Sequence, residues 1–148
     1  MPAFSNELIN FPDWIEAIAT MAGFKIQKLS RSLVAIKYKP SGGRTQTVWV
    51  SPVGKDPLDN TIISISSPAM KMGAGQYLPQ KKANDLLRQN AKLLHGAWAI
   101  ENIEGDDYLV IFDTQIAQTM DTEEFAASVK AAAFLADEME RELGREGF

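Results

Sequence analysis

Apolar residues recur with two different periods along the first half of the chain. Over residues 12–22 they return every three or four positions, which predicts a helix that begins at Pro12 and ends before Gly23. Over residues 24–67 they return every second position, in runs rich in β-branched and aromatic residues. The runs lie at 24–29, 33–39, 45–51 and 61–67. The pattern predicts one helix followed by an antiparallel meander of three or four strands.

A helical period returns in the second half, from Pro79 to Gly96. The inward stripe of this helix is expected to consist of Ala83, Leu86, Leu87, Asn90, Ala91 and Leu94. Lysine and arginine residues are expected mostly outside the stripe, at Lys81, Lys82, Arg88 and Lys92. Because an unpaired amide on an apolar stripe is costly, we expect Asn90 to hydrogen-bond neighbouring backbone.

A predicted hairpin and a long helix complete the chain. The strands lie at 97–103 and 108–114, on either side of the acidic turn 104–107. The last helix has the clearest start signal, because Asp121 can cap it and Glu124 stands at the reciprocal position three residues on. Its core-facing stripe consists of Phe125, Val129, Ala132, Ala136, Met139 and Leu143. The element order predicts an α+β fold, and the length fits one domain over residues 1–148.

Composition excludes several kinds of chemistry. The chain has no cysteine and one histidine, so disulfides, thiol nucleophiles, thiolate metal sites and histidine metal clusters are all ruled out. Residues 1–22 contain no lysine or arginine and no apolar run of secretory-signal length, and no stretch approaches a membrane span. We therefore expect a cytoplasmic protein with no membrane, metal or cofactor.

Charge is distributed unevenly. Residues 23–55 carry seven bases and no acid, whereas residues 96–148 carry thirteen acids against three bases. The fold must either bring these halves together or present two oppositely charged surfaces. Both outcomes favour self-association or charged partners.

Two short segments of the second half suggest a family. Residues 86–90 read Leu-Leu-Arg-Gln-Asn and residues 96–100 read Gly-Ala-Trp-Ala-Ile, and the final helix ends in an acidic tail over 136–140. With the element order, these segments resemble the type III secretion chaperone-like fold (the Tir chaperone class) and, within it, YbjN-type domains. The resemblance implies a small homodimer that binds other proteins, as a chaperone or a regulator, and is not an enzyme. The basic meander departs from a typical secretion chaperone.

One histidine and one group of acids are candidates for catalysis or metal binding. His95 is placed by the pattern at a helix C-terminus, where the helix dipole favours a cationic side chain, so a structural role outweighs that of a catalytic base. The acids over 101–113 could hold a divalent cation or form a catalytic pair. Most of them fall in or beside a hairpin turn and lack an EF-hand pattern, so solvated turn residues are the stronger interpretation. An enzyme of unknown class is the third-ranked hypothesis.

Glycine-containing segments are expected at 41–43, as a hairpin turn, and at 73–75, as a flexible connection. The second could be imagined as a phosphate cradle, but it lacks the Lys-Ser/Thr ending of a P-loop. If it has a role, Met70, Met72 and Tyr77 would make it an adaptable, partly apolar contact surface for a partner.

The basic strands over 25–55 raise the second-ranked hypothesis, a module that binds single-stranded nucleic acid. Sheets of that kind pair lysine or arginine with stacking aromatic residues. Alternation directs Tyr38 inward with Val34 and Ile36, whereas Trp49 shares a face with threonines and is expected to be exposed. A solvated sheet face is favoured over nucleic-acid binding.

The first-ranked hypothesis is a non-catalytic, protein-binding homodimer whose contact face lies on the last helix. Phe134 stands nearly opposite Phe125 on a helical projection and so points away from the core stripe. Small and apolar residues flank it, at Ala127, Ala131 and Leu135. We expect this face to pack against a second copy or a client protein, with Phe134 as its anchor.

Overall fold

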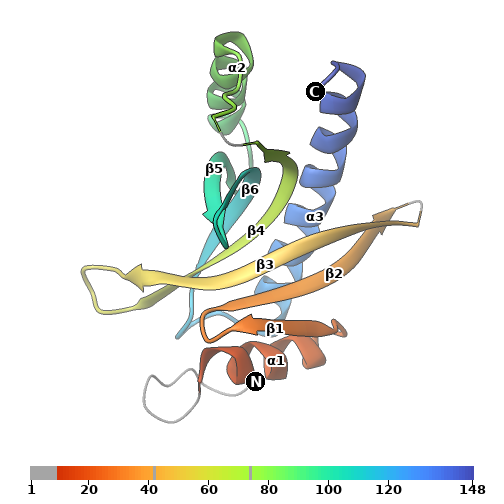
Figure 1. Cartoon of the computed structure of the whole chain (residues 1–148). Helices are drawn as coiled ribbons and strands as arrows, with labels where there is room; N and C mark the ends of the chain where they lie inside the picture. The colour runs from red at the N-terminus through yellow and green to blue at the C-terminus, as the bar shows by residue number, and fades with distance from the viewer. Residues whose placement is uncertain (1–9, 42, 74) are drawn as a thin grey trace.

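A computed structural model describes residues 10–41, 43–73 and 75–148 (Figure 1). The helices are α1 (Phe11–Met21), α2 (Gln80–Asn90) and α3 (Thr122–Arg145). The strands are β1 (Ile26–Ser30), β2 (Leu33–Ser41), β3 (Arg44–Lys55), β4 (Thr61–Met72), β5 (Ala97–Ile103) and β6 (Asp106–Ile116). Gly42 and Ala74, from the two predicted glycine segments, lie outside the described residues. The expected α+β element order is confirmed.

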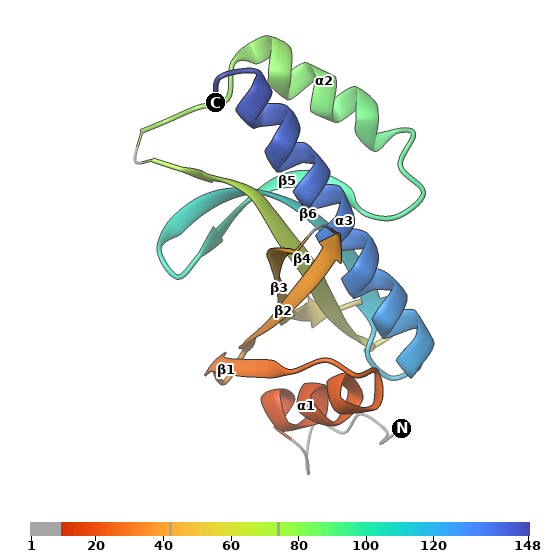
Figure 2. The same cartoon turned by 90° about the vertical axis from the view of Figure 1, so that its right-hand side faces the viewer.

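All six strands form one antiparallel sheet in the order β1-β2-β3-β4-β6-β5. The meander and the later hairpin are joined because β4 pairs with β6 along its length. The long helix α3 runs along one face of the sheet, from α1 near β1 to α2 at the opposite end (Figure 2). None of the helices in the described ranges is long and apolar enough to cross a membrane.

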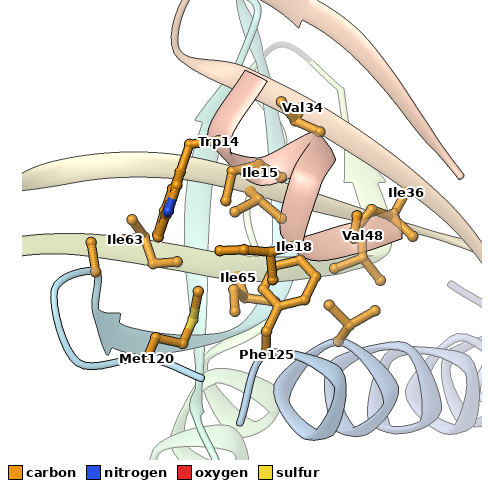
Figure 3. Packing of buried hydrophobic residues seen from close by; sticks show 14 of the residues in the cluster. Trp14, Ile15, Ile18, Val34, Ile36, Val48, Ile63, Ile65, Met120 and Phe125 are labelled. Carbon is orange, nitrogen blue, oxygen red and sulfur yellow. The ribbon is translucent and has the colours of Figure 1, made fainter. Parts of the chain in front are cut away.

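The first core cluster lies between α1, the N-terminal half of α3 and strands β2 to β4 (Figure 3). Asn10 caps α1 by accepting a hydrogen bond from the Asp13 N–H at 3.0 Å, and Pro12 stands in the first turn. The helix then buries Trp14, Ile15 and Ile18 completely. Such dense apolar packing makes this end of the sheet the main source of stability.

The helix α3 bears out its prediction. Asp121 accepts a hydrogen bond from the Glu124 N–H at 2.7 Å, which is the expected cap. All six residues of the predicted stripe are buried. Phe125 and Val129 belong to the first cluster, whereas Ala132 to Leu143 belong to a second cluster under α2, β5 and β6.

The stripe predicted for α2 was wrong in part. The helix ends at Asn90, because the N–H groups of Ala91 and Lys92 bond to carbonyls three residues back and tighten the last turn. Leu87 and Leu94 are exposed, whereas Lys82, which we expected outside, is buried beside Leu86. The helix is therefore rotated so that Lys82 and Leu86 face α3.

The strand β4 is longer than its alternating pattern predicted. It continues to Met72, which pairs with Asp107, instead of ending at Ser67. A register shift between Pro68 and Met70 absorbs the proline, which has no N–H to donate. This extension removes most of the loop that we expected before Pro79.

Candidate protein-interaction surface

One side of α3 points away from the sheet, and we call it the outer α3 face. It is an exposed row spaced by three and four residues, consisting of Glu123, Ala127, Lys130, Phe134, Glu138, Arg141 and Arg145. Phe134 lies at its centre with 47% of its surface exposed. An aromatic ring at such a position leaves apolar surface in water, which is a feature of contact sites.

The four residues predicted as a contact group on α3 are not equally accessible. Phe134 and Ala127 lie on the outer α3 face. Ala131 and Leu135 are half-buried, because they lie beside His95 and Gly96 in the segment that leads into β5. Leu135 also packs against the second core cluster. A surface centred on Phe134 is therefore charged at its flanks instead of lined by small residues on both sides.

The charges of the outer α3 face follow a definite order. An acid at Glu123 begins the row, a base at Lys130 precedes Phe134, an acid at Glu138 follows it, and Arg145 ends the row. Arg141 forms an ion pair with the buried carboxylate of Asp137, at 3.1 Å between nitrogen and oxygen. Outward from Phe134, the charge is first positive and then negative toward the N-terminus. Toward the C-terminus, it is first negative and then positive.

The three residues expected to form a contact surface around the glycine segment differ in accessibility. Met72 is buried at the end of β4, and Met70 is half-buried against the second core cluster. Tyr77 alone of the three is freely accessible, with 86% of its surface exposed. The two methionines are less accessible than expected because β4 continues through both of them, and their role in binding stays a prediction.

The basic strands do not form the aromatic platform of the nucleic-acid hypothesis. Trp49 is only 9% exposed, because its ring packs edge-on against Tyr108 at 5.0 Å between centroids. The curled sheet covers it with a third core cluster that includes Leu33, Ala35 and Val110. The expected exposure of Trp49 was wrong, whereas the inward position of Tyr38, edge-on to Phe24, is confirmed.

The fold brings several of the unevenly distributed charges together. Arg44, at the tip of the β2–β3 hairpin, donates to the buried carboxylate of Asp137 and to Glu140, both at 2.7 Å. Lys28 pairs with Asp13 and Glu16 of α1, which raises the pKa of the lysine. Two bases of the meander therefore fasten helices to the sheet, Lys28 for α1 and Arg44 for α3.

The candidate catalytic and metal-binding residues are dispersed. His95 is exposed in the segment after α2 and not at the helix end itself. Asp106 pairs with Lys71, Asp107 accepts from Asn102, and Asp113 accepts from Ser128. Within the described residues, no three histidine, aspartate or glutamate side chains gather as a metal site would require.

Two polar links fasten α2 to the rest of the molecule. Asn90 accepts from the Trp98 N–H at 2.6 Å and donates to the Trp98 carbonyl at 3.2 Å, which is the expected bonding of this half-buried amide to backbone. Lys82 reaches Glu142 at 3.0 Å and Glu146 at 3.1 Å. Sequence reasoning missed Lys82, although its spacing of four from Leu86 places the two on one side of the helix.

The glycine before β5 is required by close packing. Gly96 has a φ of +75°, and a Cβ there would lie 2.4 Å from the Phe112 carbonyl oxygen. The segment can approach β6 only because this side chain is missing. Asn90, Gly96 and Trp98, all within the two segments that suggested a family, are therefore parts of one joint between α2 and β5.

No protein-family model matches the chain, and none of the curated proteins matches it. Among solved structures, the chain is similar to the crystal structure of YbjN, "a putative transcription regulator from E. coli", with a TM-score of 0.58. The sequence identity is 16%, over 92% of this chain and 93% of that one. The chain has a YbjN-type fold. The likeness to type III secretion chaperones stays a prediction.

Proposed function

We propose that the chain is a non-catalytic, cytoplasmic protein-binding domain of a regulatory or chaperone-like kind, acting as a homodimer through the outer α3 face. The observation that carries the proposal is the half-exposed ring of Phe134 at the centre of a charge series with opposite signs on its two sides. A buried aromatic anchor with charged surroundings is the usual composition of a protein contact.

A second copy suits this face because the charge series is self-complementary. When two α3 helices cross antiparallel about Phe134, Lys130 of one copy faces Glu138 of the other, and Glu123 faces Arg145. Lys130 and Glu138 stand about 6 Å on either side of Phe134 along the axis, since a helix rises 1.5 Å per residue. A two-fold axis generates each pair twice. A parallel pairing would place like charges together.

The regulatory part of the proposal is supported by the description of YbjN, which has the same fold. Regulation through protein contacts fits this chain better than direct binding of nucleic acid. Trp49 is buried instead of offering a stacking platform, and Arg44 and Lys28 are engaged by carboxylates. The nucleic-acid hypothesis consequently ranks below the protein-binding one.

Sedimentation velocity of the wild type and of Phe134→Glu tests the proposal. The wild type should sediment as a dimer, and the variant as a monomer, because a dimer of the variant would bury two like-charged carboxylates, one from each copy, where the helices cross. Far-UV circular dichroism should be the same for both, since Phe134 does not belong to any of the three core clusters.

Leu58→Glu is the matched control, because Leu58 is an exposed apolar residue on the loop between β3 and β4. It should leave the dimer intact. A wild type that is monomeric at micromolar concentration, or a Phe134→Glu variant that stays dimeric, would contradict the proposed interface.

A further inference from the structure

The strand β5 forms one edge of the sheet and presents unpaired backbone groups along it. A two-residue turn, with both Glu104 and Gly105 at positive φ, joins it to β6, so the closing pair of Ile103 and Asp106 is hydrogen-bonded. Antiparallel pairs alternate, and hydrogen-bonded pairs therefore recur at Glu101 and Ala99. The N–H and C=O groups of Ile100 and Asn102 point outward, away from β6.

The same alternation directs the backbone of Trp98 outward, and there the edge is already occupied. The Asn90 side chain donates to one of these groups and accepts from the other, in the way that a neighbouring strand would. This agreement supports the assignment of the outward positions. The edge is closed at its N-terminal end by α2 and open at Ile100 and Asn102.

An apolar groove runs beside the open part of this edge, between α2 and β5. It has a volume of about 240 Å³, and its lining includes Leu86 and Leu87 of α2 and Trp98 and Ile100 of β5. Leu87 is 66% exposed and Ile100 is 52% exposed at its rim. Apolar side chains of an added strand would be accommodated on this side of the sheet.

On the opposite side of the sheet, Glu101 is a half-buried carboxyl whose charge is poorly compensated. Burial raises its pKa, and a hydrogen bond from the Ser66 hydroxyl offsets this only in part. None of the ion pairs between described residues includes Glu101, although Lys71 of the same face is engaged by Asp106. A cation supplied from outside would relieve the cost of burying this carboxylate.

We propose that the open edge of β5 binds an extended segment of a partner protein, in which an aliphatic residue entering the α2–β5 groove is followed by lysine or arginine opposite Glu101. The inference rests on the proposed protein-binding function and names the chemistry of the partner. Successive residues of a strand point to opposite faces, so one segment satisfies both requirements. The residue opposite Glu101 occupies a non-hydrogen-bonded pair, in which side chains approach most closely.

A second copy of β5 fits this edge poorly. An antiparallel pairing that uses the outward groups of Ile100 and Asn102 places Glu101 directly opposite its own counterpart, and like charges there are unfavourable. A pairing centred on Ile100 would need the outward backbone groups of Trp98, and the Asn90 side chain already bonds to these groups. The outer α3 face and the β5 edge thus serve different partners.

A displayed library of random seven-residue peptides, selected on the full chain, tests this assignment. Lysine and arginine flanked by aliphatic residues should be enriched at least about tenfold over the unselected library. A tenfold enrichment corresponds to an interaction of about 1.4 kcal/mol. Selection on Glu101→Lys should replace the basic residue by aspartate or glutamate. Selection on Glu101→Gln should retain the aliphatic residues and lose the charge preference.

Two further variants test the backbone edge. Ile100→Pro removes an outward N–H that an edge strand does not need for folding, and should abolish the enrichment. If that variant unfolds, Ile100→Asp keeps the strand and should abolish the aliphatic preference, whereas Leu58→Asp, another exposed apolar position, should leave the selection unchanged. No enrichment on the wild type, or enrichment that survives both Ile100 variants, would overturn the assignment.

The outcome separates the two proposals. Phe134→Glu should select the same peptides as the wild type, and Ile100→Pro should sediment as the wild type does. Loss of the dimer in an Ile100→Pro variant that keeps its far-UV circular dichroism would show that β5 pairs with a second copy, which contradicts the partner assigned to this edge. Failure of the dimer at α3 leaves the peptide result unaffected.

Discussion

The helices α1 and α2 lie at opposite ends of the sheet (Figure 1), and the two ends are packed differently. Both helices have eleven residues, yet α1 buries five side chains and α2 only two, Lys82 and Leu86. The first helix is held by an apolar cluster, whereas the second is held by one leucine and by polar links to Trp98, Glu142 and Glu146. The α1 end therefore has the larger buried apolar cluster, whereas the α2 end has an apolar groove bordered by exposed Leu87 and Ile100.

This difference separates the part of the molecule that maintains the fold from the part available for binding. Apolar clusters give the largest contributions to stability, and elements with few buried contacts open locally at lower cost. The exposed side chains of Leu87 on α2 and Ile100 on β5 lie at the lightly packed end. Loss of a side chain should accordingly have unequal effects at the two ends.

Ile18→Ala and Leu86→Ala make the comparison most directly, because both remove a buried aliphatic side chain from an eleven-residue helix. Ile18→Ala should cost about 4 kcal/mol of unfolding free energy and Leu86→Ala about 2 kcal/mol, the upper and lower parts of the range for such truncations. Ile18 is fully enclosed, whereas Leu86 borders the α2–β5 groove and can be re-solvated. Urea denaturation measures both, and equal losses would show that the two ends are packed alike.

Asn90→Ala tests the joint between α2 and β5. Removing two hydrogen bonds to the Trp98 backbone should cost about 1–2 kcal/mol. The effect should be local, with faster hydrogen exchange of the Trp98 amide and unchanged exchange in β2 and β3. Asn60→Ala is the control, because it removes the hydrogen bond that the Asn60 side chain donates to Asp56 in the β3–β4 loop, far from Trp98 in the sequence. Unchanged exchange at Trp98 would refute the joint.

Of these substitutions, Glu101→Gln should change the stability of the fold least, and it should increase it. Burial raises the pKa of Glu101, so the folded chain binds this proton more tightly than the unfolded chain does. The folded state therefore loses stability as the pH rises from the pKa of the unfolded chain, about 4.3, through the raised pKa of the folded chain. Glutamine has no charge to desolvate and can still accept the Ser66 hydroxyl. The variant should melt slightly above the wild type at pH 7 and equally at pH 3.5. A lower melting temperature at pH 7 would mean that the carboxylate is already compensated.

The same contrast explains how much the sequence could predict. Long, regular periods specified α1, α3 and the meander, and the Asp121 cap and the α3 stripe were found where the pattern placed them. The rotation of α2 could not be predicted, because Lys82 is buried by ion pairs with residues 60 and 64 positions away. Trp49 was misplaced because alternation assigns a face but not the curl by which Tyr108 covers that face. The exposure of Phe134 followed from helical geometry alone.

The most direct test of the central claim, a homodimer through the outer α3 face, mixes two charge-reversal variants. Lys130→Glu and Glu138→Lys should each be monomeric, because in an antiparallel pair each places like charges opposite one another. Mixed in equal amounts, they should form a heterodimer by sedimentation velocity, since every facing pair is then opposite in sign. Variants that dimerise alone as the wild type does, or a mixture that stays monomeric while the wild type is a dimer, would contradict the account.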